Sequence, residues 1–123
     1  MKISKATIAV FILVLLIAGA AIYWKSIGSV VQNNTATEAE AKWIGAHSVV
    51  YVQAGCIHCK DQEDLFGNNW KYINSIDCIS SQANTQACIT ANITATPTWV
   101  INGQQYVGFQ TLSNLDNLTG YKA

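Results

Sequence analysis

The sequence predicts an α/β fold preceded by a single apolar N-terminal helix, and three observations carry this prediction. Residues 6–24 are almost entirely apolar, strand-like and helix-like patterns alternate from residue 38 onward, and Asn-Gly at 102–103 separates two strand-like runs. Alternating strands and helices are typical of a layered α/β domain. The 123 residues suit one such domain. We place it at residues 38–123, after a transmembrane anchor or signal peptide at 1–25 and a linker at 26–37.

The apolar N-terminal segment predicts attachment to a membrane. Only Thr7 and Gly19 interrupt it, and at about 1.5 Å per residue such a helix nearly crosses a hydrocarbon core of about 30 Å. Lys2 and Lys5 precede the segment. The positive-inside rule therefore predicts a cytoplasmic N-terminus and a C-terminal domain outside the cytoplasm, held at the cell membrane.

Two short motifs in this segment bear on whether it is retained. Residues 23–25, Tyr-Trp-Lys, resemble an interfacial aromatic belt followed by a charged stop, which favours an uncleaved single-pass anchor. Residues 18–20, Ala-Gly-Ala, fit a small-residue cleavage site. Cleavage there would release a secreted or periplasmic domain, and this alternative stays open.

The charge of the exported part excludes one class of partner. It carries four lysines against seven acidic residues and has no basic patch, so we expect no binding of nucleic acid. Three Asn-x-Thr triplets, at 33–35, 92–94 and 117–119, fit the glycosylation pattern. So short a pattern arises easily by chance in a chain rich in Asn and Thr, and we infer no function from it.

The domain begins with a predicted helix and a predicted buried strand. Residues 38–46 form a short helix in this prediction, with Trp43 and Ile44 on its apolar side. Residues 49–52 are β-branched and aromatic, as is typical of a buried strand.

A helix with two cysteines in its first turn is predicted to follow that strand. From Cys56 the pattern is helical, because Cys59 and Phe66 are seven residues apart and share a face. Gly-Asn-Asn at 67–69 supplies the stop.

A second strand and helix are predicted next. Residues 72–79 alternate as a strand would, with Ile73 and Ile76 as buried candidates, and Ser80-Ser81 can cap a helix. The apolar stripe of this helix repeats every four residues: Ala83, Ala87 and Ala91, with Cys88 beside it.

A hairpin and a terminal helix complete the prediction. Residues 99–101 and 104–107 are joined by Asn102-Gly103, which suits a type I′ turn because both residues tolerate positive φ. Thr111 caps the last helix and Gly120 ends it. The core-facing residues of this helix are Leu112, Leu115 and Leu118.

Cys56 and Cys59 form the C-x2-C motif that carries the predicted chemistry. At the start of a helix, unpaired backbone N–H groups and the helix dipole lower the pKa of the Cys56 thiol, and a protonated His58 would add to this effect. A thiolate is the nucleophile in thiol–disulfide exchange. Because Cys59 points along the buried face, we assign Cys56 as the nucleophile and Cys59 as the resolving thiol. His58 could also be an incidental polar residue.

Other uses of the motif are weaker. A zinc site would need a second close pair, and Cys78 and Cys88 have nine residues between them. A c-type haem site needs His after the second cysteine, where this chain has Lys60. A purely structural disulfide over so small a loop would stabilise little. We therefore expect no metal and no cofactor other than the redox-active disulfide.

These elements together resemble the thioredoxin superfamily: a strand, C-x-x-C at a helix start, a strand, a helix, then Thr-Pro before a hairpin and a terminal helix. The resemblance implies a βαβαββα fold with a central sheet of about four strands flanked by helices. In that family the proline is cis and lies against the active disulfide, and the residue before it receives the substrate peptide. The matching substrate-binding pair here is Thr96 and Pro97.

One branch of the superfamily is more similar than the rest. The runs CIHCKDQEDLFG and TPTWVINGQQYVGFQTLSNL, with Cys78 and Cys88 between them, look like the thioredoxin-like partner domain of bacterial and archaeal vitamin K epoxide reductase homologues, over residues 42–118. That family implies disulfide donation to exported proteins and reoxidation by a quinone-linked membrane enzyme. Since no quinone-reductase helices are present in the sequence, we expect a separate membrane partner.

The sequence also departs from the superfamily pattern. Gly55 replaces a common tryptophan, Ile57 replaces a frequent proline, and residues 48–53 lack the buried acid of many thioredoxins, which weakens a cytosolic thioredoxin reading. A bridge between Cys78 and Cys88 would tie a strand end to the next helix and contribute about 2–3 kcal/mol. We predict that this disulfide is structural and not a relay pair, since nothing near it lowers a thiol pKa.

The sequence thus predicts an enzyme: a membrane-tethered, extracytoplasmic thiol–disulfide oxidoreductase that donates disulfides to exported proteins. A disulfide reductase or isomerase would use the same residues in the other direction. A non-catalytic binding module that uses the same fold is the alternative from another class.

Overall fold

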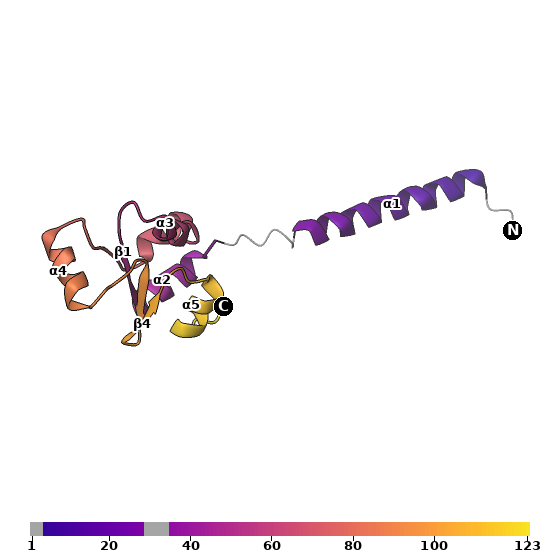
Figure 1. Ribbon diagram of the computed structural model, residues 1–123. Coiled ribbons are helices and arrows are strands. Elements are labelled where there is room, and N and C mark those ends of the chain that lie inside the picture. Colours follow the sequence, from indigo (N-terminus) through magenta and orange to yellow (C-terminus); the bar gives the residue numbers. More distant parts are fainter. Residues whose placement is uncertain (1–3, 29–34) are drawn as a thin grey trace. The chain divides into compact units, whose positions relative to one another are not determined.

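The computed structural model describes the backbone of residues 4–28 and 35–123, and the side chains of residues 4–23 and 35–123 (Figure 1). By its contacts the chain divides into two units, residues 1–33 and 34–123. Several sequence predictions lie outside the described residues. They concern Lys2, most of the linker, the first glycosylation triplet, and the side chains of Trp24 and Lys25.

The described part of the first unit, residues 4–28, contains one helix, α1 (Lys5–Gly28). Its stretch Lys5–Tyr23 has a mean hydropathy of 2.6, and none of it is buried. It is long and apolar enough to cross a membrane, a property that a signal sequence shares. The predicted apolar helix is confirmed, while its retention and its topology stay predictions.

The second unit is built on a mixed four-stranded sheet with the order β2-β1-β3-β4. β1 pairs in parallel with β2, and the pairs β1–β3 and β3–β4 are antiparallel. Val50 in the centre of β1 lies opposite Ser75 on one side and Trp99 on the other. The strands are β1 (Ser48–Val52), β2 (Ser75–Asp77), β3 (Thr98–Ile101) and β4 (Gln104–Val107).

Helices lie on both sides of this sheet, and Figure 1 shows α4 on the opposite side from α2 and α5. The side-chain oxygens of Thr37, Ser81 and Thr111 accept hydrogen bonds at the starts of α2, α4 and α5, as capping residues do. The helices are α2 (Glu38–His47), α3 (Ile57–Asp64), α4 (Gln82–Thr90) and α5 (Leu112–Thr119), with a 3-10 helix, η1 (Gly67–Tyr72).

The apolar core joins β1 and β3 to α2 and α5 and to the segment that follows α3. Its largest fully buried side chains include Trp99, Phe66, Ile44 and Leu115. α2 approaches η1 so closely that a Cβ atom on Gly45 would overlap the backbone carbonyl of Tyr72. Glycine is therefore required at this contact.

The hairpin and the last helix form as predicted. Asn102 and Gly103 have φ angles of 52° and 77°, which is the double positive φ of a type I′ turn. Leu115 is fully buried, Leu112 and Leu118 pack partly buried against the core, and Gly120 ends α5 at φ 75°.

The predicted bounds of one helix and one strand are wrong. The cysteine helix ends at Asp64, and a separate 3-10 helix begins at Gly67, where φ is 51°. The strand predicted at 72–79 is reduced to Ser75–Asp77, because it is an edge strand that pairs with β1 alone.

The alanine stripe is also wrong, since Ala83 is exposed and α4 buries only Cys88. On α2, Ile44 is fully buried as predicted, but Trp43 is 41% exposed. The Trp43 indole N–H donates to the carbonyl of Thr119 at 3.1 Å, so the ring covers the end of α5.

A pair of acidic side chains lies between α2 and α5. Burial and the neighbouring carboxyl of Glu40 raise the pKa of Asp116 to about 6. Its Oδ1 atom is buried and has no hydrogen-bond partner among the described residues. Glu40 itself accepts a hydrogen bond from the Thr37 N–H at 3.1 Å, which keeps its carboxylate in the capping interaction.

We predict that this pair makes the domain less stable as the pH rises. Because the folded pKa of Asp116 is raised, its stabilising contribution is complete below pH 3.8 and is lost as the pH passes about 6. Asp116→Asn should raise the free energy of unfolding at neutral pH by about 1 kcal/mol, a value reduced for solvent screening. Urea unfolding of the full chain in detergent, across this pH range, measures the effect. The control Asn117→Ala, on the exposed side of α5, should keep the wild-type pH slope.

Candidate dithiol site

Cys56 occupies the capping position at the start of α3. β1 ends at Val52, and the chain turns through Gly55 at φ 82°. The backbone N–H of Cys56 donates to the carbonyl of Gln53 at 3.2 Å, which closes this turn. The Sγ atom of Cys56 then accepts the backbone N–H of Cys59 at 3.2 Å. A sulfur in this position receives one of the N–H groups that a helix start leaves unpaired.

The two cysteines form a disulfide but differ in exposure. Their Cα atoms are 5.2 Å apart. Cys59 is 2% exposed and belongs to the apolar core, whereas Cys56 is only partly buried. Of the two sulfurs, that of Cys56 is therefore the more accessible to a second molecule.

The loop before β3 brings the backbone of Thr96 beside this disulfide. The Thr96–Pro97 peptide bond is cis, as the resemblance implied. The carbonyl oxygen of Thr96 lies 3.5 Å from Sγ of Cys56, and Pro97 is fully buried. The carbonyl of Pro97 accepts the N–H of Gly108 at 2.7 Å, so β4 holds the loop from its other side.

His58 and the acidic residues of α3 lie on the exposed side of the helix. The side chain of His58 is 70% exposed, and its Nδ1 atom lies 3.6 Å from the Asp61 carboxylate. Lys60 forms an ion pair with Asp64. Lys60 and Asp64 are therefore engaged with each other in solvent. The role predicted for His58 in stabilising the thiolate stays a prediction.

Cys78 and Cys88 form a second disulfide that joins the end of β2 to α4. Their Cα atoms are 5.8 Å apart, and Cys88 is the buried residue of α4. The Thr85 hydroxyl adds a hydrogen bond to the carbonyl of Cys78 at 2.7 Å. Since α4 has almost no apolar face, the disulfide anchors this helix to the sheet.

A small pocket separates this second disulfide from the loop that precedes Pro97. Its volume is about 150 Å³, and it is lined by Gln53, the two cysteines and residues 93–96. Thr96 thus contacts the pocket and also Cys56.

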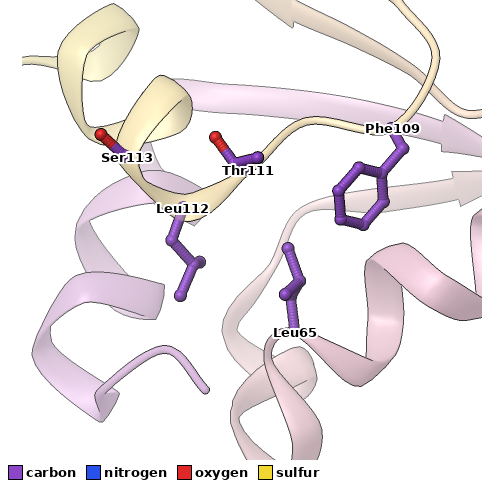
Figure 2. Close-up of a pocket in the computed structure, with 5 residues that line it drawn as sticks. All are labelled: Leu65, Phe109, Thr111, Leu112 and Ser113. Carbon is purple, nitrogen blue, oxygen red and sulfur yellow. The ribbon is translucent and has the colours of Figure 1, made fainter. Parts of the chain in front are cut away.

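A larger apolar pocket of about 320 Å³ lies between the end of α3 and the start of α5 (Figure 2). Leu65, Leu112 and Phe109 point into the same space, with Thr111 and Ser113 beside them. Phe109 follows Gly108, the residue that pairs with Pro97. The pocket residue Phe109 is therefore the direct chain neighbour of the residue that holds Pro97.

Sequence reasoning missed one residue, Gln62. It is fully buried on α3 and makes three hydrogen bonds to Trp99 and Gln110. The signal was present in the spacing, because residues 59, 62 and 66 share one helix face and two of them were already assigned to the core.

Within residues 4–28 and 35–123, no group of three or more His, Cys, Asp or Glu side chains is placed to hold a metal ion. No known family model matches the chain. The chemistry of the site therefore has to be argued from its own geometry.

We predict that the second disulfide stabilises the domain without taking part in exchange at Cys56. The double variant Cys78→Ala/Cys88→Ala should lower the free energy of unfolding by about 2–3 kcal/mol, because the unfolded chain regains the freedom of the closed loop. Denaturant unfolding measures this loss. Alkylation of reduced Cys56 should proceed at the wild-type rate, and a change of tenfold or more would show that the second disulfide influences Cys56.

Proposed function

We propose that this chain is a thiol–disulfide oxidoreductase with a thioredoxin-like fold, tethered by α1 and acting outside the cytoplasm on exported proteins. One observation carries the proposal: Sγ of Cys56 lies 3.2 Å from the backbone nitrogen of Cys59 and 3.5 Å from the carbonyl oxygen of Thr96, the residue before Pro97. The mixed sheet order β2-β1-β3-β4, with helices on both sides, supports the fold assignment.

The first step of the proposed reaction is attack on Cys56. A thiolate of the substrate attacks Sγ of Cys56, the Cys56–Cys59 bond breaks, and Cys59 leaves as a thiolate. A second substrate thiolate then attacks the substrate sulfur of this mixed disulfide. It forms the substrate disulfide and releases Cys56 as a thiolate. Two electrons pass from the substrate to the cysteine pair, which ends in the reduced state.

The difference in exposure of the two sulfurs supports these roles. Cys56 is partly exposed, so it can be attacked, whereas Cys59 is 2% exposed and serves as the internal partner. When Cys56 leaves as a thiolate, the N–H of Cys59 is positioned to stabilise the charge. His58, once protonated, would add a positive charge in the same turn. The backbone of Thr96 would hold the substrate segment beside the disulfide.

We propose oxidation as the direction, with a quinone-linked membrane protein as the reoxidant. Such a partner, similar to the vitamin K epoxide reductase homologues, would take two electrons and two protons from the reduced pair and restore the disulfide. The apolar helix α1 supports a location at the membrane where such a partner works. A reductase or isomerase would keep the Cys56–Cys59 pair mostly reduced in the cell, and thiol labelling of cell extracts tells the two directions apart.

The trapping experiment tests whether the site is catalytic. In Cys59→Ala the free Cys56 thiolate can attack a disulfide of a cellular protein, one sulfur of that disulfide leaves as a thiolate, and no internal thiol remains to reverse the step, so mixed disulfides on Cys56 should accumulate and disappear on reduction. Non-reducing electrophoresis of membranes, followed by identification of the attached proteins, measures this. The matched control Cys56→Ala should trap at least tenfold less. If Cys59→Ala traps nothing, the chain is a non-catalytic binding module.

A further inference from the structure

Gln62 is a buried polar side chain that the proposed reaction does not use. It lies on α3, three residues after Cys59, and is 0% exposed. Its Oε1 atom accepts hydrogen bonds from the Trp99 indole N–H at 3.1 Å and from the Gln110 N–H at 2.8 Å. Its Nε2 atom donates to the carbonyl of Gln110 at 3.0 Å. The amide thus makes three of the four hydrogen bonds open to it.

The orientation of this amide is determined by its partners. An indole N–H and a backbone N–H can only donate, so the atom that faces both of them must be the amide oxygen. The carbonyl of Gln110 can only accept, so it faces the amide nitrogen. A residue at this position therefore has to offer one double acceptor and one donor in a defined geometry.

Both partners of Gln62 belong to segments that hold Pro97. Trp99 follows Pro97 by two residues on β3. Gln110 follows Gly108 by two residues, and the Gly108 N–H donates to the carbonyl of Pro97 at 2.7 Å. The hydrogen bonds of Gln62 therefore connect α3 to two segments that hold the Pro97 loop.

The cysteine helix and the Pro97 loop also meet at the sulfur atoms. The Thr96 carbonyl, on the other side of the cis bond, lies 3.5 Å from Sγ of Cys56. Cys59, one turn before Gln62, is joined to Cys56 by the disulfide. The distance between the cysteine helix and the Pro97 loop is thus set at two places, by the sulfur contact at one end and by Gln62 at the other.

The amide satisfies the indole N–H of Trp99 and both backbone groups of Gln110, which an apolar side chain would leave without these partners. A directional amide adds a defined position of α3 relative to the loop. Thiol–disulfide exchange in a bound peptide depends on such alignment, because small displacements of the reacting atoms slow a reaction strongly.

We propose that Gln62 is a positioning residue of the dithiol site, whose amide holds the Cys56–Cys59 helix in register with the Pro97 loop. The inference rests on the proposed function, because it concerns how a peptide thiol meets Cys56. A peptide has to contact the Cys56 sulfur and the Pro97 loop at the same time, whereas a small thiol has to reach only the sulfur. Loss of the amide should therefore slow exchange with peptides more than exchange with small thiols.

The test compares two exchange rates in the oxidised full-length protein in detergent micelles. One substrate is 2-mercaptoethanol, and the other is an extended ten-residue peptide with one central cysteine. Gln62→Met keeps the side-chain volume and removes all three hydrogen bonds. We expect it to lower the ratio of the peptide rate to the small-thiol rate about tenfold, a loss within the range that misalignment causes.

A second variant supplies a pH signature. In Gln62→Glu the protonated carboxyl offers the same acceptor and donor as the amide, whereas the ionised carboxylate cannot donate to the Gln110 carbonyl. The rate ratio of this variant, divided by the wild-type ratio at each pH, should be near one in acid and fall as the pH rises. If Gln62→Met does not fold, Gln62→Glu can still be measured, since its protonated form retains the hydrogen bonds.

Thr119→Val is the matched control, because it removes a buried hydrogen bond, from the Thr119 hydroxyl to the carbonyl of Leu115 at 2.7 Å, within α5. It should leave the rate ratio unchanged. An unchanged ratio in both Gln62 variants, or an equal fall in Thr119→Val, overturns the positioning role and leaves the proposed function standing. Absence of exchange with either thiol in the wild-type protein overturns the proposed function itself.

Discussion

The hydrogen bond from the Cys59 N–H to Sγ of Cys56 is the interaction on which the rest of the site depends. It exists because the chain turns at Gly55 and begins a helix at Ile57, so that Cys56 takes the capping position with an extended backbone. A helix start leaves N–H groups that need a partner, and here a sulfur provides it. The N–H group that finds its partner in this sulfur also favours negative charge on it.

The fold surrounds this sulfur with fixed neighbours. Cys56 lies shortly after the end of β1, β3 begins directly after Pro97, and Gly108, which follows β4, donates its N–H to the carbonyl of Pro97. Gln62 joins the helix to both of these strand segments from within the core. The proposed chemistry therefore depends on parts of the chain that are far apart in sequence, since Thr96 lies 40 positions after Cys56.

The two disulfides have different surroundings, and this supports different roles for them. Cys56 and Cys59 lie where a helix start meets a cis proline, with one sulfur accessible. Cys78 and Cys88 join an edge strand to a helix that buries little besides Cys88 itself. α4 has too little apolar surface to bind the sheet by packing, so a covalent link replaces the missing contacts.

Local chemistry made much of the fold predictable. Asn102-Gly103, Thr111 and Gly120 act through the backbone of their immediate neighbours, and the structure agrees with the sequence at each of them. The start of the cysteine helix was predictable for the same reason. The length of β2 was not, because an edge strand extends only as far as its partner pairs with it.

By itself, the sequence determined the apolar N-terminal helix, the order of strands and helices, and the C-x2-C motif at a helix start. Only the tertiary structure decided that the Thr96 carbonyl lies against Cys56 and that Gln62 is buried between Trp99 and Gln110. These contacts join residues distant in the chain, and no local preference encodes them. They form because burying the core brings their segments together, and a buried amide must then find partners there.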